Sequence, residues 1–320
     1  MKTIGILTSG GDAPGMNAAI RAVVRAACEK GMKVYGIRRG YNGLMDNDMY
    51  EMNLRTVSDI IQRGGTILYS ARSPQFKTEE GMAKAIATCK ERGIDGLVVI
   101  GGDGSFRGAR DLSLRGIPCV AIPGTIDNDI GCCDYTIGYD TALNTVMQMV
   151  DRIRDTTESH DRCAVVEVMG RGAGYIALNS GIACGATSIL IPEIEYDFER
   201  DVIERMKRTQ KTGKVHFVII VSEAIGNVDE IAKRIQAETG VESRATVLGH
   251  VQRGGCPTCK DRLVASQMGY RAVELLNEGI GNRVVAMQKE KILDFDIYEA
   301  LNMKSGIDIN LYKIAMDISI

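Results

Sequence analysis

Three short loops in this chain combine glycine with acidic or hydroxyl side chains. They are residues 8–15 (TSGGDAPG), 101–105 (GGDGS) and 123–129 (PGTIDND), and each follows an apolar run and opens a helical stretch. Glycine lets backbone N–H groups approach an anion closely, and the N-terminus of a helix favours negative charge. Carboxylates in the same loops could hold a metal ion and accept a proton. Together the three loops indicate phosphoryl transfer.

Asp103, in the second loop, has two interpretations. It follows the buried-strand pattern 97–100 (LVVI), where a charged side chain needs a partner. Magnesium bound to nucleotide phosphates would supply one, because Mg²⁺ prefers one or two carboxylates together with phosphate oxygens. The alternative is the N-cap of a helix, a position where Asp is common. The residue types alone leave both interpretations open.

Asp127 and Asp129, in the third loop, are two residues apart. On an extended backbone both side chains would point the same way. Two like charges so close, in a site with little water, would raise the pKa of one carboxyl and suit it to accept a proton. The alternative is a solvated turn, where Asp and Asn are frequent.

The first loop and the arginines add weaker signals. The first loop lacks the G-x-G-x-x-G spacing, no Walker A sequence is present, and a tight turn is the alternative interpretation. Arginine can hold phosphate through two hydrogen bonds and stabilise a transferring phosphoryl group. Arg21 and Arg25, four residues apart, define either a solvated helix face or a second anion site. Five further arginines fall in or near expected loops: Arg72, Arg162, Arg171, Arg244 and Arg253.

Composition excludes several other classes of function. The 320 residues have a formal net charge of −2, no tryptophan and 5% aromatic residues, which argues against nucleic-acid or membrane partners. No apolar stretch resembles a signal peptide or a membrane span, so a cytoplasmic location is expected. The nine cysteines include one C-x-x-C pair, 256–259, with no second pair or nearby His, so reduced thiols are expected.

Apolar runs alternate with helical patterns along the chain, which predicts βαβ units, mainly parallel sheets and two domains. In such a sheet, ligands bind beyond the carboxyl ends of the strands. Residues 304–320 are expected to cover one domain. Helices are expected at 17–30, 78–92 and 139–155. Strands are expected at 3–8, 33–38, 94–100, 117–122, 164–168, 215–221 and 245–248.

The chain resembles the bacterial-type ATP-dependent 6-phosphofructokinases over nearly its whole length. The resemblance rests on residues 5–12 (GILTSGGD), 100–105 (IGGDGS), 123–129, 168–171 (VMGR) and 249–255 (GHVQRGG), which follow in order. It implies two similar three-layer α/β domains with mainly parallel sheets facing a central cleft. The larger, ATP-binding domain would comprise residues 1–138 and 252–303. The smaller, sugar-phosphate-binding domain would comprise residues 139–251 and 304–320.

Family members transfer the γ-phosphoryl group of MgATP to the 1-hydroxyl of fructose 6-phosphate, the committed step of glycolysis. The resemblance makes Asp127 the general base and Asp103 the Mg²⁺ residue. The other catalytic residues it implies are Arg72, Arg171, Thr125 and Asp129. The implied ATP site is Gly11, Arg72, Ser73, Gly102, Asp103, Gly104 and Ser105. The implied sugar-phosphate site is Thr125, Ile126, Asp127, Arg162, Met169, Gly170, Arg171, Glu223, Arg244, His250, Val251, Gln252 and Arg253.

The resemblance also implies a homotetramer, in which Arg162 and Arg244 reach a neighbouring subunit's site. The family has an effector site for ADP or phosphoenolpyruvate, and the residues of this chain that match it are Arg21, Arg25, Asp59, Arg154, Gly185 and Lys214. The match of Lys214 requires one inserted residue within 188–212. Leu54 stands where an effector-contacting Arg is usual. Thr187 stands where many members have a Glu that holds the effector's metal. These departures predict weak or altered activation by ADP.

Two alternatives remain. Pyrophosphate-dependent relatives usually have Asp at the position of Gly104 and Lys at that of Gly124, so the glycines favour ATP by leaving room for a nucleotide. A catalytically silent regulatory paralogue would be expected to lack Asp103 or Asp127, and this chain has both. Lipid and NAD kinases share only the GGDG element and account for none of the later motifs.

Overall fold

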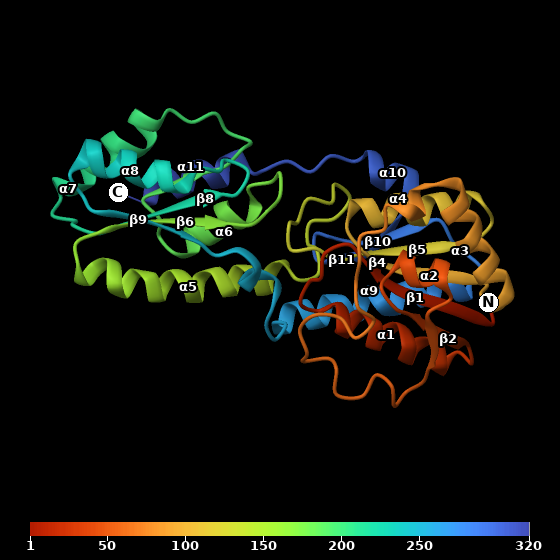
Figure 1. Cartoon of the computed structure of the whole chain (residues 1–320). Coiled ribbons are helices and arrows are strands. Elements are labelled where there is room, and N and C mark those ends of the chain that lie inside the picture. The colour runs from red at the N-terminus through yellow and green to blue at the C-terminus, as the bar shows by residue number, and fades with distance from the viewer. Residues whose placement is uncertain (320) are drawn as a thin grey trace. The chain divides into compact units, whose positions relative to one another are not determined.

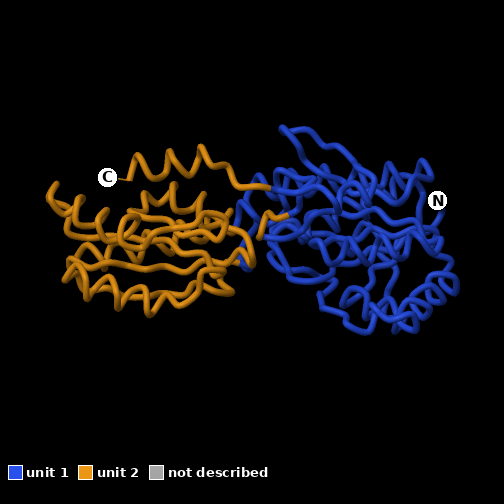
Figure 2. The backbone as a smooth tube through the Cα atoms, turned by 90° about the horizontal axis from the view of Figure 1, so that it is seen from above, with its two compact units in different colours: residues 1–126, 130–141, 253–305 blue, residues 127–129, 142–252, 306–320 orange. Residues whose placement is uncertain are grey.

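The computed structural model describes residues 1–319 (Figure 1). The chain forms two compact units, each assembled from separate stretches of sequence (Figure 2). Unit 1 comprises Met1–Ile126, Ile130–Thr141 and Arg253–Ser305. Unit 2 comprises Asp127–Asp129, Ala142–Gln252 and the described chain from Gly306 onward. Each unit has its own sheet with helices packed on it, so the predicted α/β class is confirmed.

The sheet of unit 1 has seven strands in the order β11-β10-β5-β4-β1-β2-β3. Its five central strands are parallel, and an antiparallel strand closes each edge. The four strands expected in this region are present. The structure adds β3, β10 and β11. The bounds are β1 Thr3–Ser9, β2 Lys33–Ile37, β3 Met49–Met52, β4 Gly96–Gly101, β5 Cys119–Pro123, β10 Arg283–Gln288 and β11 Lys291–Asp296.

Helices cover both faces of this sheet, with α1 and α9 below it and α4 above it in Figure 1. The α1 and α9 helices pack closely, because a Cβ on Gly269 would lie 2.8 Å from the Cβ of Ala22. The bounds are α1 Met16–Glu29, α2 Tyr41–Asp46, α3 Glu79–Glu91, α4 Asp103–Leu114, α9 Cys259–Asn277 and α10 Ile297–Asn302, with a 3₁₀ turn at Gln75–Lys77.

The sheet of unit 2 has four parallel strands in the order β7-β8-β6-β9. Apolar side chains of β6, β8 and α8 form its core, among them the fully buried Val165, Ile219 and Ile235. The C-terminal helix α11 packs on α6, as the expected cover. The strands are β6 Cys163–Val168, β7 Ser188–Leu190, β8 Phe217–Ser222 and β9 Ser243–Val247. The helices are α5 Tyr139–Ser159, α6 Tyr175–Ala183, α7 Arg205–Gln210, α8 Val228–Thr239 and α11 Ile309–Ile318, with a π-helical segment at Glu199–Glu204 and a 3₁₀ turn at Gly249–Arg253.

All nine cysteines lie in the described part of the chain and are free thiols. Within residues 1–319, no helix has the length and apolar character that a membrane span requires. In the same residues, no three His, Cys, Asp or Glu side chains form a group that could hold a metal ion. The Cys256–Cys259 pair therefore has no metal-binding partners there. The cytoplasmic location remains a prediction.

Candidate active site

The three glycine-rich loops begin where strands of the unit 1 sheet end. Ser9, at the end of β1, is in register with Gly101, at the end of β4. Gly101 is in turn in register with Pro123, at the end of β5. These strands are parallel, so their carboxyl ends share one edge of the sheet, where α/β proteins bind ligands. The three loops therefore begin at one edge of this sheet.

Hydrogen bonds link the second loop to the first and to the third. The Ser105 hydroxyl donates to the Ser9 carbonyl at 3.0 Å, and the Gly124 N–H donates to the Gly101 carbonyl at 2.9 Å. A Cβ on Gly101 would lie 2.5 Å from the Ser9 oxygen, so this approach needs glycine. Tyr41 supports the loop from inside, because its buried hydroxyl donates to the Ser105 carbonyl at 2.6 Å.

The α4 helix begins in the second loop, with Gly102 as its N-cap and Asp103 as its first residue. The N-cap interpretation of Asp103 is therefore wrong, and its side chain is 43% exposed at the positive end of the helix. Its carboxylate pairs with Arg107 at 3.0 Å. Exposed pairs of this kind contribute about 0–1 kcal/mol, so a cation could replace the arginine. Asp103 fits a magnesium ion that also binds phosphate oxygens.

Gly104 and Gly124, the two positions expected to favour ATP over pyrophosphate, have different surroundings. A Cβ on Gly104 would have no atom within 4 Å, so this position opens onto free space. A Cβ on Gly124 would lie 2.9 Å from Ile100 Cγ2 and 3.2 Å from Met16 Cε, and would enter the core. Open space at Gly104 is compatible with the expected room for a nucleotide, whereas a side chain at Gly124 would press on Ile100 and Met16.

The third loop is buried, with Thr125 8% exposed, Asp127 6% and Asn128 7%. The backbone bends at Ile126 and Asp127, and Asn128 has a positive φ of 53°. The premise of an extended segment from Asp127 to Asp129 is thus wrong. Burial also excludes the solvated turn as a description of Asp127. A buried carboxylate that follows β5 so closely in the chain suits a role in proton transfer.

The remaining site residues expected in unit 1 are Arg72, Ser73 and Arg253. Arg72 is exposed, and the Ser73 hydroxyl accepts the Phe76 N–H at 3.3 Å. Arg253 lies against the first loop, donating to the Asp12 carbonyl at 3.1 Å, and a Cβ on Gly11 would be 2.7 Å from its Nη1. The structure thus brings an expected sugar-phosphate residue next to an expected ATP residue.

In unit 2, three expected residues join in one loop after β6. Glu223 Oε1 accepts the N–H groups of Gly170, at 3.1 Å, and of Arg171. Gln252 Oε1 accepts the Met169 N–H at 3.1 Å. Glu223 and Gln252 follow β8 and β9, which flank β6. These two side chains therefore fix the backbone of residues 169–171.

This loop has an unusual backbone. Gly170 has a φ of +148°, and a Cβ there would lie 2.4 Å from the Ala173 carbonyl oxygen. Arg171 has a φ of +60°, a conformation that costs a non-glycine residue about 1–3 kcal/mol. The arginine side chain is exposed. A strained loop braced by two polar side chains is typical of a ligand-binding site.

Arg162 and Arg244 share one carboxylate. Arg162 Nε lies 3.0 Å from Glu242 Oε2, and Arg244 Nη2 lies 2.6 Å from Glu242 Oε1. Hydrogen bonds from the two arginines lower the pKa of Glu242. Glu242 was not among the expected site residues, although it lies two residues before Arg244. His250 and Val251 are exposed on the 3₁₀ turn that follows β9.

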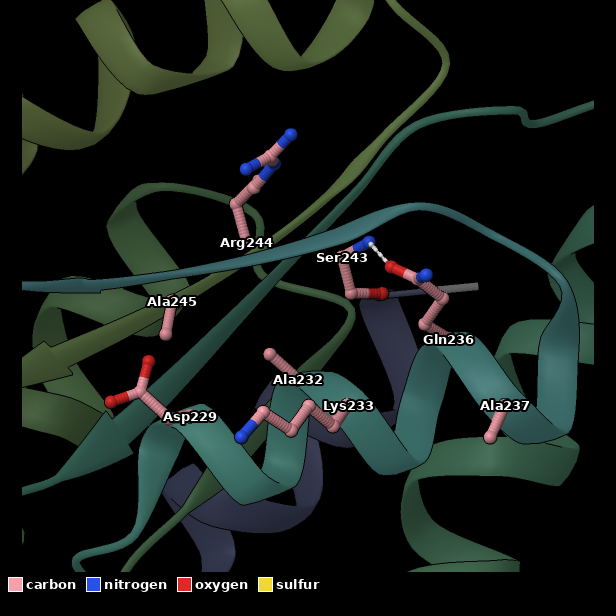
Figure 3. A pocket seen from close by; sticks show the side chains of 8 residues that line it. All are labelled: Asp229, Ala232, Lys233, Gln236, Ala237, Ser243, Arg244 and Ala245. Carbon is pink, nitrogen blue, oxygen red and sulfur yellow. Dashed lines mark hydrogen bonds between the residues drawn. The ribbon is translucent and has the colours of Figure 1, made fainter.

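A polar groove of unit 2 lies between α8 and β9 (Figure 3). Arg244 and Ala245 point to opposite sides of the strand there, as neighbours on a strand do. Arg244 alone among the expected site residues lines this groove, so it does not define the site. The lining residues are Asp229, Ala232, Lys233, Gln236, Ala237, Ser243, Arg244 and Ala245.

The expected effector residues of unit 1 lie on α1 and in a nearby loop. Arg21 and Arg25 are four residues apart on α1, and burial followed by the charge of Arg25 lowers the pKa of Arg21. Asp59 has a positive φ of 55° and is exposed. Leu54, which stands where the family usually has an effector-contacting Arg, is 51% exposed. It therefore places an apolar side chain on the surface of the unit.

In unit 2, Lys214 lies 3.4 Å from the Thr187 hydroxyl, and Arg154 donates to the Cys184 carbonyl, next to Gly185. Burial lowers the pKa of Lys214, and the charge of Arg154 lowers it further. Thr187 is fully buried. The π-helical segment Glu199–Glu204 lies within 188–212 and holds more residues per turn than an α-helix, which is compatible with the expected insertion.

Comparisons with known proteins agree with this architecture. A family model described as phosphofructokinase matches residues 3–276. The chain is 56% identical over 319 residues to a Clostridium botulinum protein named ATP-dependent 6-phosphofructokinase, covering 100% of both chains. It is also 56% identical over 320 residues to a Bacillus cytotoxicus protein of that name, again covering 100% of both.

Solved structures show the same fold. The Saccharomyces cerevisiae phosphofructokinase structure matches with a TM-score of 0.90 at 33% identity, covering 100% of this chain and 48% of the yeast chain. The pyrophosphate-dependent phosphofructokinase of Marinobacter aquaeolei has a TM-score of 0.86 at 22% identity, covering 97% of this chain and 86% of that one, a likeness of fold alone. From the family model and the full-length relatives, the chain belongs to the phosphofructokinase family.

Proposed function

We propose that this protein transfers the γ-phosphoryl group of MgATP to the 1-hydroxyl of fructose 6-phosphate, giving fructose 1,6-bisphosphate and ADP. The observation that carries the proposal is 56% identity, over the full length of both chains, to a relative named ATP-dependent 6-phosphofructokinase. The register of β1, β4 and β5 supports it, because it aligns a glycine-rich loop, a helix N-terminus with Asp103 and the loop of Asp127.

In the proposed mechanism, Asp127 accepts the proton of the attacking hydroxyl. Its burial keeps competing water away, and Thr125 and Asp129 position the acceptor. Magnesium, held by Asp103 and phosphate oxygens, would neutralise charge that develops on the phosphates. Arg72 and Arg171 stabilise the transferring group, since guanidinium groups bind phosphoryl oxygens strongly. Gly11, Ser73 and residues 102–105 bind the nucleotide.

The sugar phosphate is bound by the braced loop of residues 169–171 and by four cationic side chains, two of them from a neighbouring subunit. We propose that Arg162, Arg244, His250 and Arg253 hold the 6-phosphate. Glu242 pairs with both Arg162 and Arg244, so a phosphate group could take the place of its carboxylate between the two arginines. As in the family, the enzyme would be a homotetramer in which these two arginines serve a neighbouring subunit. Dissociation would then abolish activity.

Phosphorus NMR of the products tests the proposed function. The purified protein is incubated with MgATP and either fructose 6-phosphate, glucose 6-phosphate or fructose. We expect fructose 1,6-bisphosphate and ADP with the first acceptor and little turnover with the other two. Equal turnover of unphosphorylated fructose would contradict the phosphate clamp. No turnover with any acceptor would favour a regulatory paralogue.

Gly170→Ala tests the loop of residues 169–171. The added Cβ would clash with the Ala173 carbonyl at a positive φ, so the loop must shift. Strain of about 1–3 kcal/mol corresponds to a roughly 5- to 150-fold loss of kcat/KM for fructose 6-phosphate. We expect the KM for ATP to change less than twofold. Steady-state kinetics measures both.

The matched control is Gly172→Ala, in the same loop. A Cβ on Gly172 would have no atom within 4 Å, and its φ is not positive. This variant should keep wild-type kinetics. If both alanine variants lose the same activity, general loop flexibility matters and the specific geometry of Gly170 does not.

Weak ADP activation is expected from the two departures at the effector site. A lost arginine removes charge-assisted hydrogen bonds of about 1.5–3 kcal/mol each, which weakens an effector roughly tenfold or more. Activity at subsaturating fructose 6-phosphate, with and without ADP, measures this. Leu54→Arg restores the cation at an exposed position and should increase the activation. Strong ADP activation of the unmodified chain would contradict the prediction.

A further inference from the structure

Asp261, in the first turn of α9, is fully buried although it is acidic. Its Oδ1 accepts the Tyr135 hydroxyl at 2.6 Å and the Gly138 N–H at 2.7 Å. Its Oδ2 accepts the N–H of Thr141 at 2.9 Å and its hydroxyl at 2.5 Å. All four donors come from residues 135–141. A buried carboxylate is tolerated when it has such partners, so Asp261 and this segment fold as one cluster.

The N-terminus of α9 completes the cluster. The Thr258 hydroxyl caps the helix by accepting the Asp261 N–H at 3.3 Å. The Thr258 N–H donates to the Thr141 hydroxyl at 3.0 Å. The first turn of a helix favours a negative charge, which supports an ionised Asp261. Burial acts against it and raises the pKa of Asp261, and the hydrogen bonds lower it in part.

The segment held by Asp261 pairs directly with the loop of Asp127. The Ile137 N–H donates to the Pro123 carbonyl at 3.0 Å, and Gly124 and Ile137 form a β-bridge. The Thr136 hydroxyl donates to the Thr125 carbonyl at 2.6 Å. The backbone of residues 123–125 is therefore fixed to residues 136–137 just two residues before Asp127.

The cluster also lies where the chain passes from one unit to the other (Figure 2). Unit 1 gives way to unit 2 after Ile126 and again after Thr141, inside α5. Asp261 stays in unit 1 and binds Thr141 directly. Asp261 thus fixes Thr141, the last unit 1 residue before the second passage into unit 2. Through residues 136–137 it also fixes residues 123–125, which precede the first passage.

We propose that Asp261 is a positioning residue for phosphoryl transfer: by fixing residues 135–141 it holds the loop that carries Asp127 in its reactive conformation. The inference rests on the proposed function. A misplacement of about 1 Å can cost a reaction roughly 100-fold in rate without removing any reacting group. The competing explanation is that Asp261 merely stabilises the start of α9, in which case its loss would change stability and leave kcat intact.

The test compares Asp261→Asn with Asp296→Asn, each measured as kcat and KM per folded protein, with circular dichroism and melting temperature. In Asp261→Asn, the NH₂ group of the new amide would face hydrogen-bond donors of residues 135–141, which need an acceptor. The cluster must therefore rearrange. Asp296 is the N-cap of α10, also in unit 1, and provides the same substitution at another helix start. We expect kcat to fall about 10- to 100-fold in Asp261→Asn with the KM for ATP within twofold. Asp296→Asn should keep the wild-type kcat, because the asparagine oxygen can still accept the Tyr298 N–H and cap α10.

Thr141→Val and Thr141→Ser keep the test decisive if Asp261→Asn does not fold. Valine removes the hydroxyl that links Asp261 to Thr258, and serine retains it. Thr141→Val should lower kcat and Thr141→Ser should restore it. If wild type turns over and the folded Asp261 or Thr141 variants match its kcat, the inference is overturned and the proposed function stands. If wild type itself does not turn over, the proposed function fails, and the inference with it.

Discussion

Asp127→Asn is expected to lower kcat for fructose 6-phosphate by about 10²- to 10⁴-fold, the usual contribution of a general base. Asparagine has nearly the shape of aspartate and cannot accept the proton of the attacking hydroxyl. Because Asp127 is only 6% exposed, bulk water cannot readily substitute for the missing carboxylate. The KM values for both substrates should change far less than kcat. Steady-state kinetics on the folded variant measures these constants.

Asp155→Asn is the matched control for Asp127→Asn. Asp155 is exposed on α5, and the same substitution there should leave kcat within twofold of wild type. Its melting temperature shows what an Asp-to-Asn change does away from the site. An Asp127→Asn enzyme that retains more than about a tenth of wild-type kcat would remove Asp127 from the role of base.

Gly104→Asp should lower kcat/KM for ATP by about 100-fold or more, since a like-charge contact costs several kcal/mol. The position opens onto free space, so the new side chain can fold in without a clash. It would place a second carboxylate beside Asp103, at the α4 N-terminus where the nucleotide phosphates are proposed to bind. The loss should appear mainly as a higher KM for ATP, with the KM for fructose 6-phosphate nearly unchanged.

Gly104→Ala separates charge from bulk. Its uncharged Cβ has no atom within 4 Å, so most of the wild-type kcat/KM should remain. If alanine and aspartate lose the same activity, steric exclusion of the nucleotide explains the result. If Gly104→Asp binds ATP as well as wild type does, α4 does not begin at the phosphate site.

The sequence was sufficient to predict where the loops of the candidate site begin, because these positions follow from β1, β4 and β5. Each contains a buried apolar run and is followed by glycine, a pattern that indicates both the strand and its carboxyl end. The edge strands are harder to recognise. Strand β3 has only four residues, including a Glu, and β11 (KILDFD) has three charged residues among its six. Strand β10 (RVVAMQ) carries a clear apolar run that was overlooked.

Side-chain partners were less predictable, since they come from distant parts of the chain. Arg253 contacts the Gly11 loop across 241 residues of sequence, and Asp261 binds Tyr135 across 126. A single sequence contains no signal for such pairs. The bend at Asp127 and the positive φ of Asn128 depend on burial of the whole loop, so local spacing suggested an extended segment. The atoms that a Cβ at Gly124 would meet depend likewise on how this residue packs against Ile100.

The most direct test of ATP-dependent phosphoryl transfer is a comparison of phosphoryl donors. Wild-type protein is assayed with saturating fructose 6-phosphate and Mg²⁺, with ATP or pyrophosphate as the varied substrate, and kcat/KM is measured for each. We expect kcat/KM for ATP to exceed that for pyrophosphate by about 100-fold or more, because the open position at Gly104 leaves room for a nucleotide. A pyrophosphate value equal to or above that of ATP would contradict it.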